Sequence, residues 1–270
     1  MKRKLLLLGG SGLVGRALSA ALEADYQIVP TGGNRRPKNG YLLRAEEPNR
    51  LLEVLEREAP AVVVSSIRGD FQAQAAFHRA LADWMAGRDG RLLYISTANV
   101  FDGDLSRPWT EADPPAAASD YGRFKGACET MLRERLGERL AVFRLATVWD
   151  SNCPRVRQLE ERSRRGEPHP TCPGCMVNVT LAEQIGAYAE YVLRRDLHGV
   201  FHVGTTDMVE YPAFEKMVCE AIGVPPPEFV GEAAGRTAFQ AVLPTRREIP
   251  DALQLTVAQA AAALGRRRLP

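Results

Sequence analysis

Short apolar runs alternate with amphipathic stretches along the first half of the chain. Leu5–Leu8 and Ala61–Val64 are continuous apolar runs, a pattern typical of strands that are buried on both faces of a parallel sheet. Between such runs, apolar residues recur three or four positions apart, which predicts helices. The predicted strands are Leu5–Leu8, Tyr26–Val29, Tyr41–Leu43, Ala61–Val64, Arg91–Ile95 and Leu140–Leu145, and the predicted helices are Leu13–Glu23, Arg50–Arg57, Phe71–Met85 and Ser119–Leu136. This alternation predicts an α/β fold with a doubly wound parallel sheet.

The pattern changes after Thr147. Residues 151–177 contain four prolines and no clear periodicity, so we expect a loop with one solvated, charged helix over Arg155–Arg165. Further on, the sequence predicts helices over Leu181–Leu193, Tyr211–Ile222 and Val257–Leu264, and a strand over Gly199–Val203. We therefore expect a dinucleotide-binding domain from residues 1–150 and about 180–204. Residues about 151–179 and 205–270 would form a small C-terminal substrate lobe at the carboxyl edge of the sheet.

Composition and charge narrow the class of protein. The 270 residues are 45% hydrophobic and 25% charged, and 35 basic against 33 acidic residues leave a net charge of +2. Such a balance gives no field that would recruit nucleic acid or an anionic membrane. Leu5–Leu8 is too short for a signal-peptide core or a membrane span. We expect a cytoplasmic protein that acts on a small molecule, and we leave a homodimer open.

A glycine motif follows the first predicted strand directly. Gly9, Gly12 and Gly15 have the spacing that allows a tight turn, a close approach of backbone to a pyrophosphate, and close packing of helix on strand. Its position between a strand and a helix favours a Rossmann-type dinucleotide site over a glycine-rich turn without a ligand. The expected cofactor contacts from this segment are Gly9, Ser11, Gly12, Leu13, Val14 and Gly15.

Basic residues follow the second predicted strand, where such folds meet the adenosine ribose. An acidic residue there favours NAD, whereas arginine accommodates the 2′-phosphate of NADP. This chain places Asn34, Arg35 and Arg36 there and has no acidic residue before Glu46. The sequence therefore favours NADP(H), with a solvated basic loop as the alternative.

A tyrosine and a lysine four residues apart open the predicted helix at Ser119–Leu136. Tyr121 and Lys125 share one face of that helix, and a nearby cation lowers the pKa of a phenol. Thr97 follows a buried strand, 24 residues before the tyrosine, where its hydroxyl would bind the same carbonyl oxygen as Tyr121. The three residues predict acid–base chemistry at a carbonyl group, although a tyrosine–lysine pair alone is also common on helix surfaces.

These motifs together resemble the extended short-chain dehydrogenase/reductases, and within them the dTDP-4-dehydrorhamnose reductase family. The residues that carry the resemblance are Gly9–Gly15, Ser96–Gly103, Tyr121–Lys125, Phe143–Leu145, Thr180–Ile185 and Gly199–Gly204. The resemblance implies NADPH as cofactor and hydride transfer to the C4 ketone of a nucleotide-linked sugar. It implies that Thr97, Tyr121 and Lys125 form the catalytic triad and that Lys125 also holds the nicotinamide ribose. Ser65 and Ser66 are added to the expected cofactor contacts, as are Tyr121 and Lys125.

This chain departs from the family pattern on the substrate side at Ser65–Ile67, over Ser151–Met176 and directly after Thr97. Ala98 and Asn99 replace the usual Asp-Tyr pair that follows the threonine. The family also contains the regulatory beta subunit of methionine adenosyltransferase, so a non-catalytic NADP-binding subunit is one alternative. An epimerase or dehydratase acting on a nucleotide sugar is another.

A Cys-x-x-Cys motif stands in the proline-rich segment. Cys172 and Cys175, with His169 and Cys153 nearby, have the residue types of a zinc half-site, and the pair could equally be redox-active. No second tight pair follows, so we expect no metal. The five cysteines of the chain, an odd number, also argue against a disulfide framework. We expect His202, Trp84, Trp109 and Trp149 to be core or cleft-wall residues.

Overall fold

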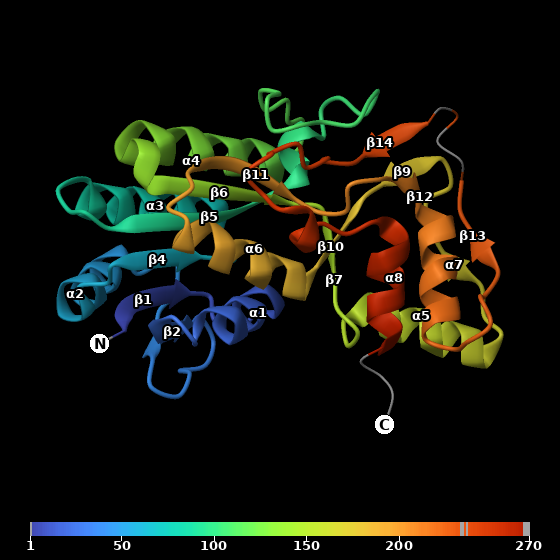
Figure 1. Ribbon diagram of the computed structural model, residues 1–270, viewed down its shortest axis with the longest axis horizontal. Helices are drawn as coiled ribbons and strands as arrows, with labels where there is room; N and C mark the ends of the chain where they lie inside the picture. The colour runs from blue at the N-terminus through green and yellow to red at the C-terminus, as the bar shows by residue number, and fades with distance from the viewer. Residues whose placement is uncertain (1, 233–234, 236, 267–270) are drawn as a thin grey trace.

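The computed structural model describes residues 2–232, 235 and 237–266. A seven-stranded parallel sheet forms its centre, in the order β11-β6-β5-β4-β1-β2-β3 (Figure 1). The strands are β1 (Arg3–Leu8), β2 (Tyr26–Gly32), β3 (Tyr41–Leu42), β4 (Val62–Ser65), β5 (Arg91–Thr97), β6 (Leu140–Leu145) and β11 (Gly199–Val203). The predicted doubly wound α/β sheet is confirmed.

Helices cover both faces of this sheet (Figure 1). Leu5 and Leu7 of β1 join the core beneath α1 (Leu13–Leu22) and α6 (Ala182–Arg194). Leu6 and Leu8 face the opposite core, which the helices α2 (Pro48–Glu58), α3 (Phe71–Ala86) and α4 (Asp120–Leu136) complete. Both faces are buried, which explains why strands of this sheet are apolar throughout rather than alternating.

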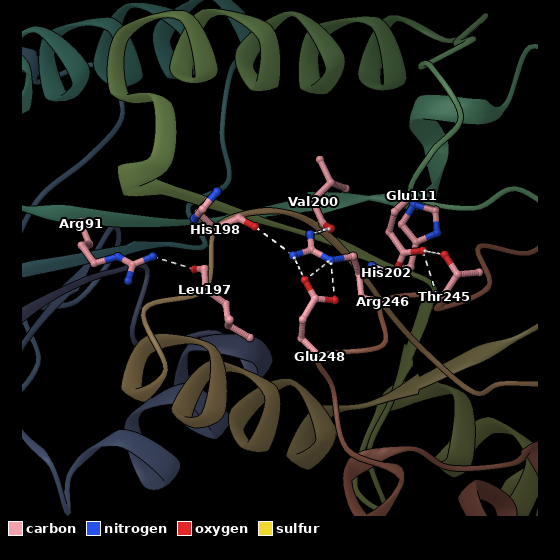
Figure 2. A network of polar contacts seen from close by, with 9 residues as sticks. All are labelled: Arg91, Glu111, Leu197, His198, Val200, His202, Thr245, Arg246 and Glu248. Atoms are coloured by element: carbon pink, nitrogen blue, oxygen red, sulfur yellow. Dashed lines mark hydrogen bonds and ion pairs between the residues drawn. The ribbon is translucent and has the colours of Figure 1, made fainter.

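Side chains seal the free edge of β11, as Figure 2 shows. The Arg246 guanidinium donates hydrogen bonds to the carbonyl oxygens of Val200 (2.9 Å) and His198 (3.2 Å). The Glu111 carboxylate accepts from the backbone N–H of His202 at 3.0 Å. Because these groups occupy the positions that a further strand would use, a second chain could not extend the sheet through β11 without displacing them.

Three small sheets lie beyond the carboxyl ends of the central strands (Figure 1). They pair β7 (Thr147–Trp149) with β10 (Val179–Leu181), β8 (His169–Pro170) with β13 (Phe229–Val230), and β9 (Cys175–Val177) with β12 (Val209–Glu210) and β14 (Ala238–Gln240). A third apolar cluster joins them to α5 (Pro154–Arg165), α7 (Tyr211–Ala221) and α8 (Val257–Arg266). Short 3₁₀ turns occur at η1 (Ala98–Phe101), η2 (Gly137–Arg139) and η3 (Asp251–Leu253).

Two expectations for this part of the chain are wrong. Residues 151–177 are not a loop around one helix, because β8 and β9 lie within them. Strands of two or three residues are too short to show an alternating pattern. The helix α5 is not solvated all round, since Val156 and Leu159 are fully buried. The division into two lobes stays a prediction.

The helices of the described residues are each too short or too polar to cross a membrane.

The expectation that His202 and the three tryptophans are core or cleft-wall residues is confirmed. Trp149 and His202 are fully buried, and Trp84 and Trp109 are nearly so.

Candidate active site

The glycine motif forms a tight turn between β1 and α1. Gly9 has a φ of +85°, which favours glycine, and a Cβ on Gly15 would collide with the Gly9 carbonyl oxygen. The N–H of Gly10 donates to the Thr31 carbonyl at 2.8 Å, which ties the turn to β2. A Cβ on Gly12 would meet only the Gly9 oxygen, at 3.7 Å, and otherwise face open space.

The start of α1 therefore has the features of a pyrophosphate cradle. Its N-cap, Gly12, has no side chain to accept a hydrogen bond from the first-turn amides. Such amides carry the positive end of the helix dipole and bind phosphate oxygens. Gly12 leaves room for the anion, and Ser11 and Gly12 are exposed while Leu13 and Val14 are half-buried. The residues present fit the pyrophosphate of a dinucleotide.

The two serines after β4 lie in different surroundings. Ser66 packs against the glycine turn and donates its hydroxyl to the Leu8 carbonyl at 3.1 Å. Ser65 is buried, and its Oγ lies 2.8 Å from Nε2 of His78. His78 Nδ1 lies 2.7 Å from the Gln74 carbonyl, so Nδ1 holds the proton and Nε2 accepts from Ser65. A contact of Ser65 with a cofactor would have to use its backbone.

The basic loop after β2 is exposed. Asn34, Arg35 and Arg36 all lie at the surface, and Arg36 donates to the Gly40 carbonyl at 2.8 Å. Arg44, which sequence reasoning missed, donates to the Gly33 carbonyl at 3.0 Å and so adds a further cation to this loop. The arginine stands 12 positions after β2 ends, too far along the chain for a local motif to reveal it.

The positions of Thr97 and Tyr121 depend on contacts just before α4. Thr97 ends β5, and Asp102 accepts hydrogen bonds from the N–H groups of Ala118 and Ser119. Ser119 caps α4 by accepting from the Gly122 N–H at 3.0 Å. A Cβ on Gly122 would collide with the backbone of η1, so the first turn of α4 lies directly against the residues that follow Thr97. The structure thus brings Thr97 and Tyr121 together.

The Tyr121 phenol is 40% exposed. Burial of part of the ring raises the pKa of Tyr121, although a hydrogen bond with Thr97 and the positive charge of Arg68 act to lower it. The motif led us to expect that Lys125 lowers this pKa, but the pKa of Tyr121 is raised and Lys125 is not among the groups that act on it. Tyr121 therefore retains its proton at neutral pH, as a proton donor must.

Lys125 is a buried cation. Its side chain is 5% exposed, and Nζ donates a 2.7 Å hydrogen bond to the Ile95 carbonyl. Nζ also lies 4.2 Å from the centre of the Tyr94 ring. Burial lowers the pKa of Lys125 to about 8, so the ammonium loses its proton closer to neutrality than an exposed lysine does.

A cavity of about 290 Å³ adjoins Thr97. Ala98 and Asn99 line it, so both departures from the family pattern border the space where a substrate would lie. The opposite wall comes from residues 239–242, and the Phe239 N–H donates to the Leu105 carbonyl at 2.9 Å. Sequence reasoning missed this wall, because β14 is three residues long and reaches the site only through the tertiary fold.

Arg155 is the one basic side chain among the described residues that line this cavity. Its guanidinium lies 5.8 Å from the Trp149 ring centre, and the residue forms a hydrogen bond with Tyr211. Arg155 opens α5 directly after Pro154, so the cation and the N-terminal end of a helix occur together. A negatively charged group in the cavity would be attracted by both.

The Cys-x-x-Cys pair forms a disulfide between Cys172 and Cys175. Cys175 lies on β9, whose neighbour β14 leads into the cavity wall. His169 points elsewhere, with Nε2 3.1 Å from the Glu215 carboxylate. Within the described residues, no three His, Cys, Asp or Glu side chains gather as metal ligands.

Comparison with known proteins decides the family. The RmlD substrate binding domain family matches residues 3–265, nearly the whole chain. The chain belongs to this family. The resemblance found in the sequence is therefore confirmed for the RmlD-like family and for the extended short-chain dehydrogenase/reductase fold.

The curated relatives include a reductase of a dTDP-linked keto sugar and the beta subunit of a methionine adenosyltransferase. The chain is 26% identical over 252 residues to dTDP-4-keto-6-deoxy-D-glucose reductase of Streptomyces niveus, which covers 84% of this chain and 81% of the relative. It is 30% identical over 173 residues to methionine adenosyltransferase 2 subunit beta of Rattus norvegicus. That match covers 59% of this chain and spans half the length of the relative.

Solved structures share the fold over the full length. The dTDP-4-dehydrorhamnose reductase of Bacillus anthracis, solved in complex with NADP, superposes with a TM-score of 0.85 at 17% identity and covers 100% of both chains. The dTDP-glucose 4,6-dehydratase of the same organism, solved with NAD, gives a TM-score of 0.80 at 13% identity and covers 98% of this chain and 96% of that one.

Proposed function

We propose that this protein is an NADPH-dependent reductase that acts on the ketone of a nucleotide-linked sugar. One observation carries the proposal: Thr97 and Tyr121 are within hydrogen-bonding reach of each other, and Thr97 also lines the 290 Å³ cavity. The cavity is thus lined by a hydroxyl that has a protonated phenol beside it, and these are the two donors that a carbonyl oxygen needs.

The cofactor site is inferred from the glycine turn and the basic loop. Gly9, Gly12, Gly15 and the first-turn amides of α1 would hold the pyrophosphate. Asn34, Arg35 and Arg36 would hold the 2′-phosphate of NADP(H), since guanidinium groups bind phosphate in a forked geometry. The reductase of Bacillus anthracis was solved with NADP, which supports the same choice for this chain.

In this proposal, each catalytic residue has a separate task. The nicotinamide, when bound, supplies the hydride. Tyr121 protonates the carbonyl oxygen as general acid. The Thr97 hydroxyl, which donates to the Asn99 side-chain oxygen at 2.9 Å in this structure, turns to donate a second hydrogen bond to the carbonyl oxygen. Lys125 binds the nicotinamide ribose through its ammonium group. The raised pKa of Tyr121 suits reduction, because the phenol must hold a proton when the oxygen becomes basic.

A negatively charged substrate is favoured by Arg155. Arg155 lines the cavity from the start of α5, and its guanidinium lies beside the aromatic rings of Trp149 and Tyr211. The diphosphate of a nucleotide sugar has the charge to pair with such a group. Reductases of dTDP-linked keto sugars among the relatives support this class of substrate.

A non-catalytic NADP-binding subunit is the second candidate, because the match at 30% identity is to the beta subunit of a methionine adenosyltransferase. Such a subunit would need the cofactor site and Lys125 but no proton donor. The retained Thr97–Tyr121 pair favours the enzyme.

Two variants on α5 test whether Arg155 binds the substrate. Arg155→Ala should raise KM for a dTDP-linked 4-keto sugar by about 10-fold or more, the weight of a charged hydrogen bond, and leave KM for NADPH unchanged. Arg157→Ala removes an exposed arginine two positions along and serves as the control. Equal KM values for Arg155→Ala and Arg157→Ala on every nucleotide sugar tried would contradict the proposed substrate class. No NADPH consumption by the wild type with any ketone would favour the regulatory subunit.

A further inference from the structure

The shortest contacts of the Lys125 ammonium come from one strand, β5. Tyr94 presents the face of its ring 4.2 Å from Nζ, and the next residue, Ile95, accepts the 2.7 Å hydrogen bond with its carbonyl oxygen. Thr97 lies two positions further along the same strand. The distance of the lysine from the catalytic hydroxyl is therefore set by how α4 sits on β5.

The Tyr94 ring is itself buried and packs against a histidine. It is 1% exposed, and the His78 imidazole meets it edge-on, with ring centres 5.0 Å apart and planes at 83°. His78 is fixed by hydrogen bonds to Ser65 and to the Gln74 carbonyl. Burial lowers the pKa of His78 to about 3, so the imidazole is neutral and adds no charge beneath the ammonium. The Tyr94 ring therefore lies against a neutral, hydrogen-bonded partner.

A buried ammonium needs such contacts. Its desolvation is costly, and the hydrogen bond to Ile95 satisfies one of its three N–H donors. The negative face of an aromatic ring attracts a cation more strongly when both are removed from water. The Tyr94 face thus favours the charged form of Lys125 without an ion pair that would pull the side chain out of place.

We propose that Tyr94 is a positioning residue that holds the Lys125 ammonium at the ribose end of the cofactor site through the face of its ring. The link to a cofactor site rests on the proposed function, whereas the contact between the ring and the ammonium does not depend on any reaction. Tyr94 does not touch substrate, and its phenol oxygen has no part in the role. Phenylalanine at position 94 should therefore preserve the role of Tyr94. A ring whose face has lost electron density should not preserve it.

Other groups around Lys125 also influence its titration. The titratable and charged groups that face it are His78 from α3, Cys128 and Glu129 from α4, and Tyr94 from β5, with Arg144 of β6 paired to Glu129. Tyr94→Phe and the trifluorophenylalanine variant both lack the phenol oxygen that interacts with Cys128, so the difference between these two variants reports the ring alone.

The test follows Lys125 directly by NMR. The chain has five lysines, so ¹³Cε-labelled lysine gives a spectrum in which Lys125→Met identifies the signal. The wild type and Tyr94→Phe should titrate with the same midpoint, near pH 8. Substitution of Tyr94 by 3,4,5-trifluorophenylalanine, which keeps the ring and withdraws electrons from its face, should lower the midpoint by about 0.5 to 1 pH unit. Tyr94→Leu should lower it as far or further.

The affinity for NADPH gives the second readout. The trifluorophenylalanine variant should bind NADPH about 2- to 5-fold more weakly than Tyr94→Phe at pH 8, because less of Lys125 is charged. The trifluorophenylalanine ring is close in shape to phenylalanine, so the comparison stands even if Tyr94→Leu fails to fold. Equal Lys125 midpoints in the phenylalanine and trifluorophenylalanine variants would overturn the role of Tyr94. A shifted midpoint with unchanged NADPH affinity in all variants, Lys125→Met included, would instead overturn the proposed role of Lys125.

Discussion

Arg144 of β6 and Glu129 of α4 form an ion pair in the interior, with Nη2 and Oε2 2.7 Å apart and both side chains at most 2% exposed. The Ser96 hydroxyl donates to the same carboxylate at 2.5 Å, so the Glu129 carboxylate of α4 contacts side chains of both β5 and β6. Lys125 lies one helical turn before Glu129. This contact therefore fixes the helix that bears Tyr121 and Lys125 against the strand that bears Thr97.

The pair predicts a large loss of stability when one partner is removed. Arg144→Met leaves the Glu129 carboxylate buried without its counter-charge and should lower the free energy of unfolding by about 3–5 kcal/mol. Urea unfolding measures it. The double variant Arg144→Met/Glu129→Met should recover part of the loss, because no buried charge remains. If Arg144→Met were as stable as the wild type, the prediction that the buried pair stabilises the fold would be contradicted.

The pKa of Lys125 predicts an alkaline limit. The ammonium carries its proton below about pH 8 and loses it as the pH rises through that value. Since the ribose contact needs the proton, kcat/KM for NADPH should be level below pH 7 and fall about tenfold per pH unit above 8. Tyr121 has a raised pKa and stays protonated across this range, so its titration does not change the pH profile there. A profile that is level to pH 9.5 would argue against the role of Lys125.

The basic loop predicts a cofactor preference. NADPH should bind more tightly than NADH, because Arg35 and Arg36 are exposed where the 2′-phosphate would lie and no acidic residue stands between β2 and Glu46. Arg35→Asp should reverse or level the preference in titration calorimetry, whereas Arg165→Asp, an equal change of charge on α5, should not. Equal affinities of the wild type for the two cofactors would contradict this prediction.

The cysteines give a chemical prediction. Unfolded, unreduced protein should show three reactive thiols, from Cys128, Cys153 and Cys219, and five after reduction. Elemental analysis of the purified protein should show no stoichiometric zinc. Five thiols before reduction together with one zinc per chain would recast the segment around Cys172 as a metal site.

The sequence predicted the parts of the site that lie close together along the chain. The turn at Gly9–Gly15 and the pair of Tyr121 and Lys125 follow from local spacing, and the buried strands follow from continuous apolar runs. It could not predict that Lys125 turns toward Tyr94, because that contact depends on how a helix packs on a strand 30 residues away. Nor could it predict Arg155 or β14 at the cavity, since short strands and single arginines carry no periodic signal. The proline-rich segment was misjudged for the same reason.

The central claim is that Tyr121 donates a proton during NADPH-dependent reduction, and one measurement tests it most directly. NADPH absorbance is followed with dTDP-linked 4-keto sugars and simpler ketones, for the wild type, Tyr121→Phe and the control Tyr191→Phe on α6. Tyr121→Phe should lose turnover by about 10²-fold or more, the usual weight of a general acid, with NADPH affinity nearly unchanged. Tyr191→Phe should retain turnover. Full activity of Tyr121→Phe on a substrate that the wild type reduces well would contradict the account.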